Sequence, residues 1–342
     1  MTINRTVYGV IGFGGTGCLG IRELNHQAAL DGNTVKYVSA AIDTEDSNFK
    51  GIDIDDEYKL NIGLRPQQID DIIANPDLFG KITQVVVEKH SERLLTLKNE
   101  NGSCTTPLLT AVAAEYYSQE IVKLLQKIVE KATSMGAKRL LLIMMSSTGG
   151  GAGRALLSCV SQLLADSSKS DSRLREGISH IQIDLVHVVA DPFGYTHAIP
   201  SSQADNLLAN VLGSRYEIAE LEKEGTVRWV YRIGKANSNG VVLDTREKVI
   251  NALGNAVYAL LTNWSYLTTQ YANSADRMRE FNYNGSDTPE AAGLSWEGLS
   301  TSTQRQVLIP VQFDLHNPQF IRNHVGMHVE GGHNGNGHPK AK

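Results

Sequence analysis

The chain has 342 residues, with 32 Lys and Arg against 37 Asp and Glu and a formal net charge of -5. This length allows one large α/β domain, a smaller second element and a sizeable buried core. The slightly acidic balance, with no dense run of Lys or Arg, excludes the electrostatic footprint of a nucleic-acid-binding protein. Cys18, Cys104 and Cys159 lack metal-ligand or disulfide spacing, as expected in a reducing compartment.

The first residues, MTINRTVYGVIGF, contain no basic segment followed by a long apolar one. No stretch reaches about 18 uninterrupted apolar residues, which is the length that a membrane span needs. We therefore expect a soluble, cytoplasmic protein without a membrane span.

Short apolar runs typical of buried parallel strands recur along the chain and alternate with segments of helical periodicity. The strand-like runs are Val7–Gly12, Val35–Asp43, Arg139–Met145, His180–Ala190 and Val227–Ile233, and the helical segments include Pro107–Ala132, Arg154–Ala165 and Thr245–Gln270. This alternation predicts a Rossmann-like α/β fold, in which helices cover both faces of a parallel sheet.

The pattern weakens after about residue 271. Residues 305–315 are the one later stretch that clearly predicts a strand. The end, EGGHNGNGHPKAK, has nothing to bury and is expected to be disordered. The last predicted helix therefore leads into a small C-terminal element.

The first glycine-rich loop, GFGGTG at residues 12–17, lies between a predicted strand and a predicted helix. It fits the dinucleotide fingerprint G-x-G-x-x-G, whose glycines let backbone N–H groups approach a phosphate at a helix N-terminus. Asp43 ends the second predicted strand, where a Rossmann enzyme uses an acid to bind a ribose hydroxyl. On this loop alone, an NAD-dependent oxidoreductase is one candidate.

The second glycine-rich loop, GGGAG at residues 149–153, again joins a buried strand to a helix and creates another nest of N–H donors. A dinucleotide needs one such loop, whereas a triphosphate held from both sides uses two. The alternative is that both clusters are only tight turns, but that gives no steric reason for so many small residues, which cost backbone entropy. Neither loop contains the lysine of a P-loop.

With both loops considered, the sequence resembles the tubulin/FtsZ superfamily of GTP-binding cytoskeletal proteins over roughly residues 5–265. VIGFGGTGCLGIREL is similar to the first glycine loop of FtsZ, AAIDTEDSNF resembles its AxNTDxxxL loop, and STGGGAGRA resembles the signature GGGTGTG. HVVADPFGY and VYRIGKANSNG follow in the same order and resemble the strand ends beside the ribose and the base. The relaxed signature is more similar to divergent bacterial, archaeal or phage tubulin-like proteins than to FtsZ or eukaryotic tubulin themselves.

The resemblance implies a GTP-binding domain at residues 1–243 and a long central helix at 244–272. A reduced C-terminal α+β element at 273–327 and a disordered tail at 328–342 would follow. The implied ligands are GTP or GDP and Mg²⁺, and the implied partner is a second copy of the chain in a longitudinal polymer, with an adaptor left open.

The resemblance also implies roles for individual residues. The α- and β-phosphates would be held by Gly12, Gly14, Gly15, Gly17 and Cys18, and the β/γ side by Gly149, Gly150, Gly151, Ala152 and Gly153. Asp43, Thr44 and Glu45 would lie near the γ-phosphate and Mg²⁺, with Glu45 as the metal ligand.

Further contacts would come from three other segments. Asn101, Gly102 and Ser103 would form a third phosphate loop, unless they are a simple turn in which Thr105 or Thr106 caps the next helix. Pro192 and Phe193 would line the ribose side, although Phe193 could equally belong to the core. Asn237 or Asn239, and Asn251, would read guanine; a loop Asn is otherwise unremarkable.

Two positions of the second loop depart from the family signature. Ala152 replaces a Thr, which removes one hydrogen bond. Arg154 stands where the family has a small or hydroxyl residue, and its guanidinium would either contact a phosphate or project from the helix.

Hydrolysis in this superfamily is completed by the next subunit, whose loop after the central helix carries N-x-D-x-x-[DE]. No intact copy occurs in YANSADRMREFNYNGSD. Asp276 and Glu280, four residues apart, would share a helical face, and Asp287 keeps the outer spacing with Asn284 in place of the middle acid. Because ordinary surface acids explain these residues equally well, we expect slow GTP hydrolysis or none.

The leading interpretation is therefore a GTP-binding, tubulin/FtsZ-like protein and weak GTPase that assembles head to tail into nucleotide-dependent filaments. The first alternative is a nucleotide-binding scaffold or regulatory module of the same fold that does not polymerise. The second is the NAD-dependent oxidoreductase, which offers no use for the second glycine loop.

Overall fold

The computed structural model describes residues 6–99, 106–166, 181–235, 242–271 and 278–281. The strands are β1 (Thr6–Phe13), β2 (Tyr37–Asp43), β3 (Lys59–Asn61), β4 (Arg139–Ser147), β5 (Gln182–Ala190), β6 (Trp229–Ile233) and β7 (Met278–Phe281). The α-helices are α1 (Gly14–Leu30), α2 (Pro66–Ala74), α3 (Lys81–Thr96), α4 (Pro107–Tyr116), α5 (Ser118–Ser134), α6 (Gly151–Asp166), α8 (Ser201–Lys223) and α9 (Arg246–Tyr271). Single 3₁₀ turns are η1 (Asp46–Phe49), η2 (Asp56–Tyr58), η3 (Pro76–Leu78), η4 (Leu97–Asn99), η5 (Pro192–Gly194) and η6 (Thr196–Ala198).

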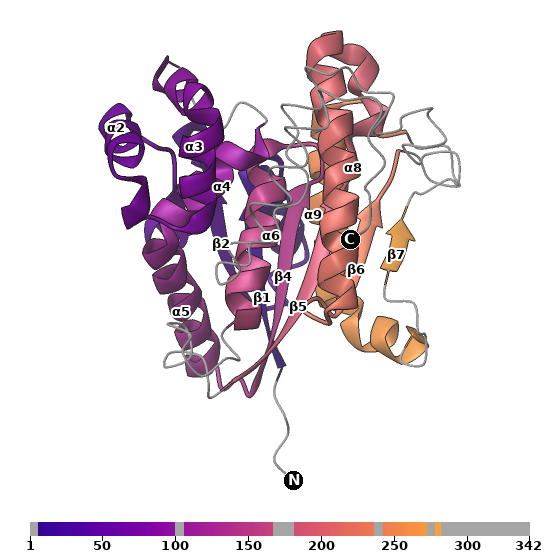
Figure 1. Cartoon of the computed structure of the whole chain (residues 1–342). Coiled ribbons are helices and arrows are strands. Elements are labelled where there is room, and N and C mark those ends of the chain that lie inside the picture. Colours follow the sequence, from indigo (N-terminus) through magenta and orange to yellow (C-terminus); the bar gives the residue numbers. More distant parts are fainter. Residues whose placement is uncertain (1–5, 100–105, 167–180, 236–241, 272–277, 282–342) are drawn as a thin grey trace, which may run out of the picture.

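The strands form one parallel sheet in the order β3-β2-β1-β4-β5-β6-β7 (Figure 1). The strands β1 and β4 are neighbours, with Gly12 opposite Met145 near their carboxyl ends. From this pair the chain continues in opposite directions, because β2 follows β1 on one side and β5 follows β4 on the other. Ligands of open parallel sheets bind outside the carboxyl ends of the strands at such a reversal. The fold therefore puts the candidate site between β1 and β4.

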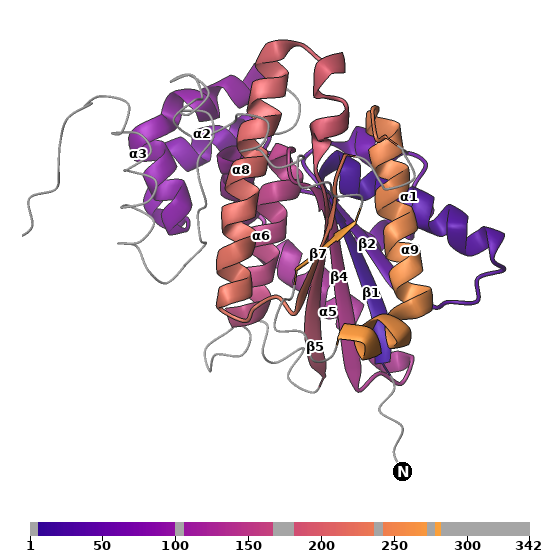
Figure 2. The same ribbon diagram turned by 90° about the vertical axis from the view of Figure 1, so that its right-hand side faces the viewer.

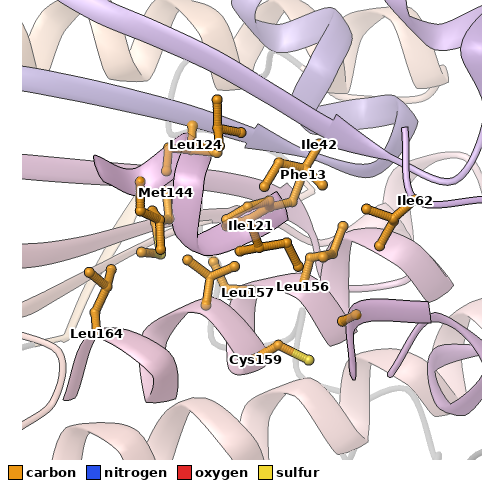
Figure 3. Packing of buried hydrophobic residues seen from close by; sticks show 14 of the residues in the cluster. Phe13, Ile42, Ile62, Ile121, Leu124, Met144, Leu156, Leu157, Cys159 and Leu164 are labelled. Atoms are coloured by element: carbon orange, nitrogen blue, oxygen red, sulfur yellow. The ribbon is translucent and has the colours of Figure 1, made fainter. Parts of the chain in front are cut away.

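Each face of the sheet packs against its own layer of helices (Figure 2). The helices α1 and α9 cover one face, where their buried residues pack with Val10, Ile143 and Val188. The opposite face is covered by α4, α5, α6 and α8. Figure 3 shows part of that core, in which Leu156 and Leu157 lie near Phe13. Because both faces are covered, the central strands are continuous apolar runs rather than alternating ones.

The five strands and the long helix at 245–270 predicted from the sequence are confirmed, with boundaries that move by one or two residues at most ends. The prediction of one helix over 107–132 was wrong, because the chain bends at Tyr117, between α4 and α5. At this point Tyr116 stacks on Phe79, and the Tyr117 hydroxyl accepts a hydrogen bond from Gln68 Nε2 at 2.9 Å.

The structure also corrects one expectation about the acids after α9. Residues 278–281 form β7, in which Glu280 lies opposite Arg232 of β6. Asp276 and Glu280 therefore do not share the face of one helix, as the four-residue spacing had suggested. Asp276 and Asp287 lie outside the described residues, as do the predicted strand at 305–315 and the tail. None of the helices within the described ranges is both long and apolar enough to cross a membrane.

Candidate functional site

The first glycine loop packs tightly against the carboxyl ends of β1 and β4. An added Cβ at Gly12 would lie 2.4 Å from the carbonyl oxygen of Gly17, and one at Gly17 would lie 2.3 Å from that of Met145. Gly14 has a φ of 65°, in the left-handed region that favours glycine. Side chains at these positions would push α1 off the sheet. Glycine therefore lets the N-terminus of α1 lie directly over the two strand ends.

The two glycine loops meet backbone to backbone. An added Cβ at Gly14 would lie 2.6 Å from the amide nitrogen of Gly153, and one at Gly153 would lie 3.0 Å from the carbonyl oxygen of Phe13. Because α1 begins at Gly14 and α6 at Gly151, the N-termini of two helices converge at this contact. Both ends carry unsatisfied N–H groups and partial positive charge. The arrangement suits an anion bound by both loops at once.

Only part of each loop is open to solvent. Gly15, Thr16 and Gly150 are partly exposed, and an added Cβ at Gly150 would meet no atom within 4 Å. The other predicted phosphate-contacting residues of the loops are buried: Gly12, Gly14, Gly17, Cys18, Gly149, Gly151, Ala152 and Gly153. The Cys18 thiol points inward and donates to the carbonyl oxygen of Gly12 at 3.5 Å. Burial, together with the charge of Asp43, raises the pKa of this thiol well above its ordinary value.

A buried carboxylate ends β2. Asp43 is 2% exposed, its Oδ1 accepts the Thr44 N–H at 2.6 Å, and its Oδ2 accepts Asn48 Nδ2 at 2.7 Å. Burial raises the pKa of Asp43 to about 6, although these hydrogen bonds oppose the shift. Because its side chain is buried and hydrogen-bonded within its own loop, the carboxylate is not presented to a ribose as in a Rossmann enzyme. It orders the loop that carries Thr44 and the partly exposed Glu45.

Arg154 takes neither of the positions expected from the sequence. Its side chain is fully buried, and its Nη2 donates to Oε1 of Glu217 on α8 at 2.8 Å. Asn210 accepts from Arg154 Nη1 at 3.3 Å and donates from Nδ2 to the carbonyl oxygen of Gly149 at 2.9 Å. The Ser158 hydroxyl donates to the second oxygen of Glu217 at 3.0 Å. The predicted phosphate ligand is thus part of a buried polar network that holds the second glycine loop on α8.

The end of β5 contacts the second glycine loop and the residue before it. Asp191 is buried and accepts hydrogen bonds from Thr148 Oγ1 at 2.5 Å and from Arg215 at 3.2 Å. Burial raises the pKa of Asp191, and the charges of Arg232 and Arg215 partly offset this. The next residue, Pro192, lies against the second loop, because an added Cβ at Gly149 would come 2.6 Å from its Cγ. The side chain of Phe193 lies outside the described part of the structure.

The helix α9 brings two polar side chains, one of which sequence reasoning missed. Arg246, its first residue, places Nη2 2.6 Å from where a Cβ of Gly15 would be, and Asn48 lies 3.0 Å from the same point. Asn251 is partly buried, and its Oδ1 is a buried acceptor without a hydrogen-bond partner. A buried orphan acceptor needs a donor.

The remaining predicted contacts, Asn101, Gly102, Ser103, Asn237 and Asn239, lie outside the described residues. Within the described ranges, no three His, Cys, Asp or Glu side chains gather to hold a metal. Mg²⁺ bound to phosphates needs only one or two carboxylates from the protein.

No protein-family model matches the chain, and no curated protein matches it. Several solved structures are similar to it at low identity. They include CetZ1 from Haloferax volcanii as a GDP-bound monomer, with 12% identity, a TM-score of 0.47 and coverage of 77% of this chain and 63% of that one. CetZ from Methanosaeta thermophila has 13% identity, a TM-score of 0.48 and coverage of 80% and 61%. FtsZ from M. jannaschii, as an empty dimer, has 16% identity, a TM-score of 0.43 and coverage of 76% and 55%. The chain thus spans 55% to 63% of the length of these three structures.

Because the two loops touch at Gly14 but not at Gly150, we expect substitution by alanine to affect stability differently at these two positions. Gly14→Ala should lower the free energy of unfolding by at least about 2 kcal/mol, because it adds a left-handed non-glycine residue and a backbone clash. Gly150→Ala, in open space, should change it by less than about 0.5 kcal/mol. Urea unfolding followed by circular dichroism measures both, and equal stabilities would contradict the described contact.

We expect a large loss of stability when one partner of the buried Arg154–Glu217 pair is neutralised. Glu217→Gln should lower the free energy of unfolding by about 3–5 kcal/mol, because it leaves the guanidinium buried without its counter-charge. The matched control is the exposed pair of Arg22 and Glu247, where Glu247→Gln should cost less than about 1 kcal/mol. Equal losses in urea unfolding would show that the Arg154 network is not buried as described.

The raised pKa of Asp43 should make stability depend on pH. Its pKa of about 6 in the folded protein lies above the unfolded value, so its contribution to the free energy of unfolding is fully present below about pH 4 and is lost as pH rises through 6. Between pH 4.5 and 7.5, the free energy of unfolding of the wild type should therefore fall by about 2 kcal/mol relative to that of Asp43→Asn. Urea unfolding of both proteins across this range measures the difference, which a constant offset would contradict.

Proposed function

We propose that the protein binds a nucleoside triphosphate, GTP, across the paired glycine loops. The contact between Gly14 and Gly153 carries the proposal, because it joins two helix N-termini into one site. A polyphosphate carries more negative charge than one helix end can neutralise. In this arrangement the α- and β-phosphates lie on the first loop and the γ-phosphate on the second, where Gly150 is open.

Asn251 supports guanine as the base. Its buried Oδ1 is an acceptor without a partner, and guanine offers neighbouring N–H donors at N1 and N2. The sequence resemblance to GTP-binding tubulin-like proteins points to the same base.

A dinucleotide at this site is less well supported. The strand order is the one that dinucleotide-binding sheets share, so topology alone fits both ligands. Asp43 disfavours the dinucleotide, because its carboxylate is buried and is not open to a ribose hydroxyl. A dinucleotide also leaves the second glycine loop without a ligand.

The sequence resemblance extends the proposal to self-assembly and hydrolysis. Copies would join head to tail with the nucleotide between them, Glu45 would bind Mg²⁺ beside the phosphates, and acids after α9 of the next copy would act on the γ-phosphate. Of these acids, Glu280 lies on β7, three strand positions or roughly 14 Å across the sheet from β4. This separation from its own glycine loops is compatible with a role in a neighbouring copy.

A negative charge introduced into the site tests nucleotide binding. Gly150→Asp should weaken GTP binding at least about 100-fold, because it adds a negative charge where phosphate binds. Gly225→Asp, at an exposed turn with a φ of 74° that Asp tolerates, is the matched control and should bind as wild type. Calorimetric titration with GTP, ATP and NAD measures the affinities. Wild-type binding of NAD but not GTP would overturn the proposal in favour of the oxidoreductase.

Assembly is tested separately by light scattering of the purified chain with Mg²⁺. GTP should raise the scattering, while GDP and ATP should leave it unchanged. A chain that binds GTP but stays monomeric at saturation would be the non-polymerising module.

A further inference from the structure

Arg246 brings a positive charge from α9 to the first glycine loop. Its Nη2 lies 2.6 Å from the position that a Cβ of Gly15 would occupy, so the guanidinium lies directly against this glycine. Gly15 is partly exposed and belongs to the first turn of α1. The guanidinium thus lies at the open part of the loop, beside the N–H groups at the start of α1.

The other charged residues of this turn of α9 are paired. Glu247 binds Arg22 of α1 at 2.8 Å, and Lys248 binds Asp244 at 2.7 Å. In the part of the chain that the structure describes, no carboxylate pairs with Arg246. Asp43, which accepts a hydrogen bond from Asn48, is buried. Arg246 is therefore a cation without a counter-charge in this region.

Arg246 is exposed to solvent, and its positive charge lies beside the N-termini of two helices. A cation in the first turn of a helix opposes that helix's dipole, and Arg246 begins α9. Its guanidinium also lies beside the positive end of α1. An anion placed between the guanidinium and the α1 N-terminus would be attracted by both.

Arg246 also lies near the other side of the site. Burial raises the pKa of Tyr195, the residue after η5, and the charge of Arg246 lowers it in turn. The guanidinium therefore stands within electrostatic reach of both the first glycine loop and the end of β5. A bound nucleotide would extend between these two segments if its ribose lay beside Pro192.

We propose that Arg246 is a cationic ligand of the nucleotide site and binds the phosphates through charge-assisted hydrogen bonds. This inference rests on the proposed function. It supplies what the loops lack: they contain no P-loop lysine, and Arg154 is buried against Glu217. A planar guanidinium can bind two phosphate oxygens at once, whereas a lysine contributes a point charge.

The test compares GTP with guanosine, which has the same base and ribose but no phosphate. Arg246→Ala should weaken GTP binding about 10-fold to 100-fold and change guanosine binding by less than about twofold. Arg246→Lys should restore part of the GTP affinity, because it keeps the charge but not the bidentate geometry. Lys248→Ala, which removes one positive charge from the same turn, is the matched control and should weaken GTP binding less than about threefold.

Calorimetric titration of the purified full chain measures these affinities. Wild-type GTP affinity in Arg246→Ala, or an equal loss of GTP and guanosine binding, would overturn the role of Arg246 while leaving the nucleotide site in place. A wild-type chain that binds neither GTP nor GDP would overturn the proposed function, and the role of Arg246 with it.

Discussion

The close approach of Gly14 to Gly153 is the constraint on which the rest of the site depends. Two helices can begin at one point of the sheet only if their first turns carry almost no side chains. The reversal of strand order between β1 and β4 supplies the point, and the missing side chains of Gly12 and Gly17 let α1 approach it. The result is a pair of helix N-termini whose N–H groups face a common space, which favours an anion before any charged side chain contributes.

The buried charged residues near the contact between Gly14 and Gly153 hold the surrounding loops in position. Glu217 and Asn210 of α8 hold the second loop through Arg154 and Gly149. Asp43 similarly orders the loop after β2, at the cost of a carboxylate held in the interior. Such pairs are sensitive to the loss of one partner, because the other is left charged in a medium of low dielectric. The positions of these two loops therefore depend on buried polar contacts with other parts of the chain.

Much of this fold was predictable from the sequence, because the strands β1, β4 and β5 are apolar runs that both helical layers bury. The glycine loops were also predictable from local sequence, because a cluster of glycines between a strand and a helix is typical of an anion-binding loop. The fate of Arg154 was not, because its partner Glu217 lies 63 residues away and belongs to a helix that the sequence pattern did not single out. Arg246 and Asn48 were missed because their closeness to Gly15 arises only when α9 and η1 pack beside α1. A basic residue at the start of a helix, where acids are favoured, was the one local signal.

The central claim is that both glycine loops bind one ligand together, and hydrogen exchange of the purified chain tests it most directly. On addition of GTP with Mg²⁺, backbone amides of residues 12–18 and of residues 149–154 should become protected together, with the same dependence on GTP concentration. Protection of the first loop alone would contradict the claim and would favour a dinucleotide-type site. Protection of neither loop at saturating GTP would show that the paired helix N-termini do not form a nucleotide site.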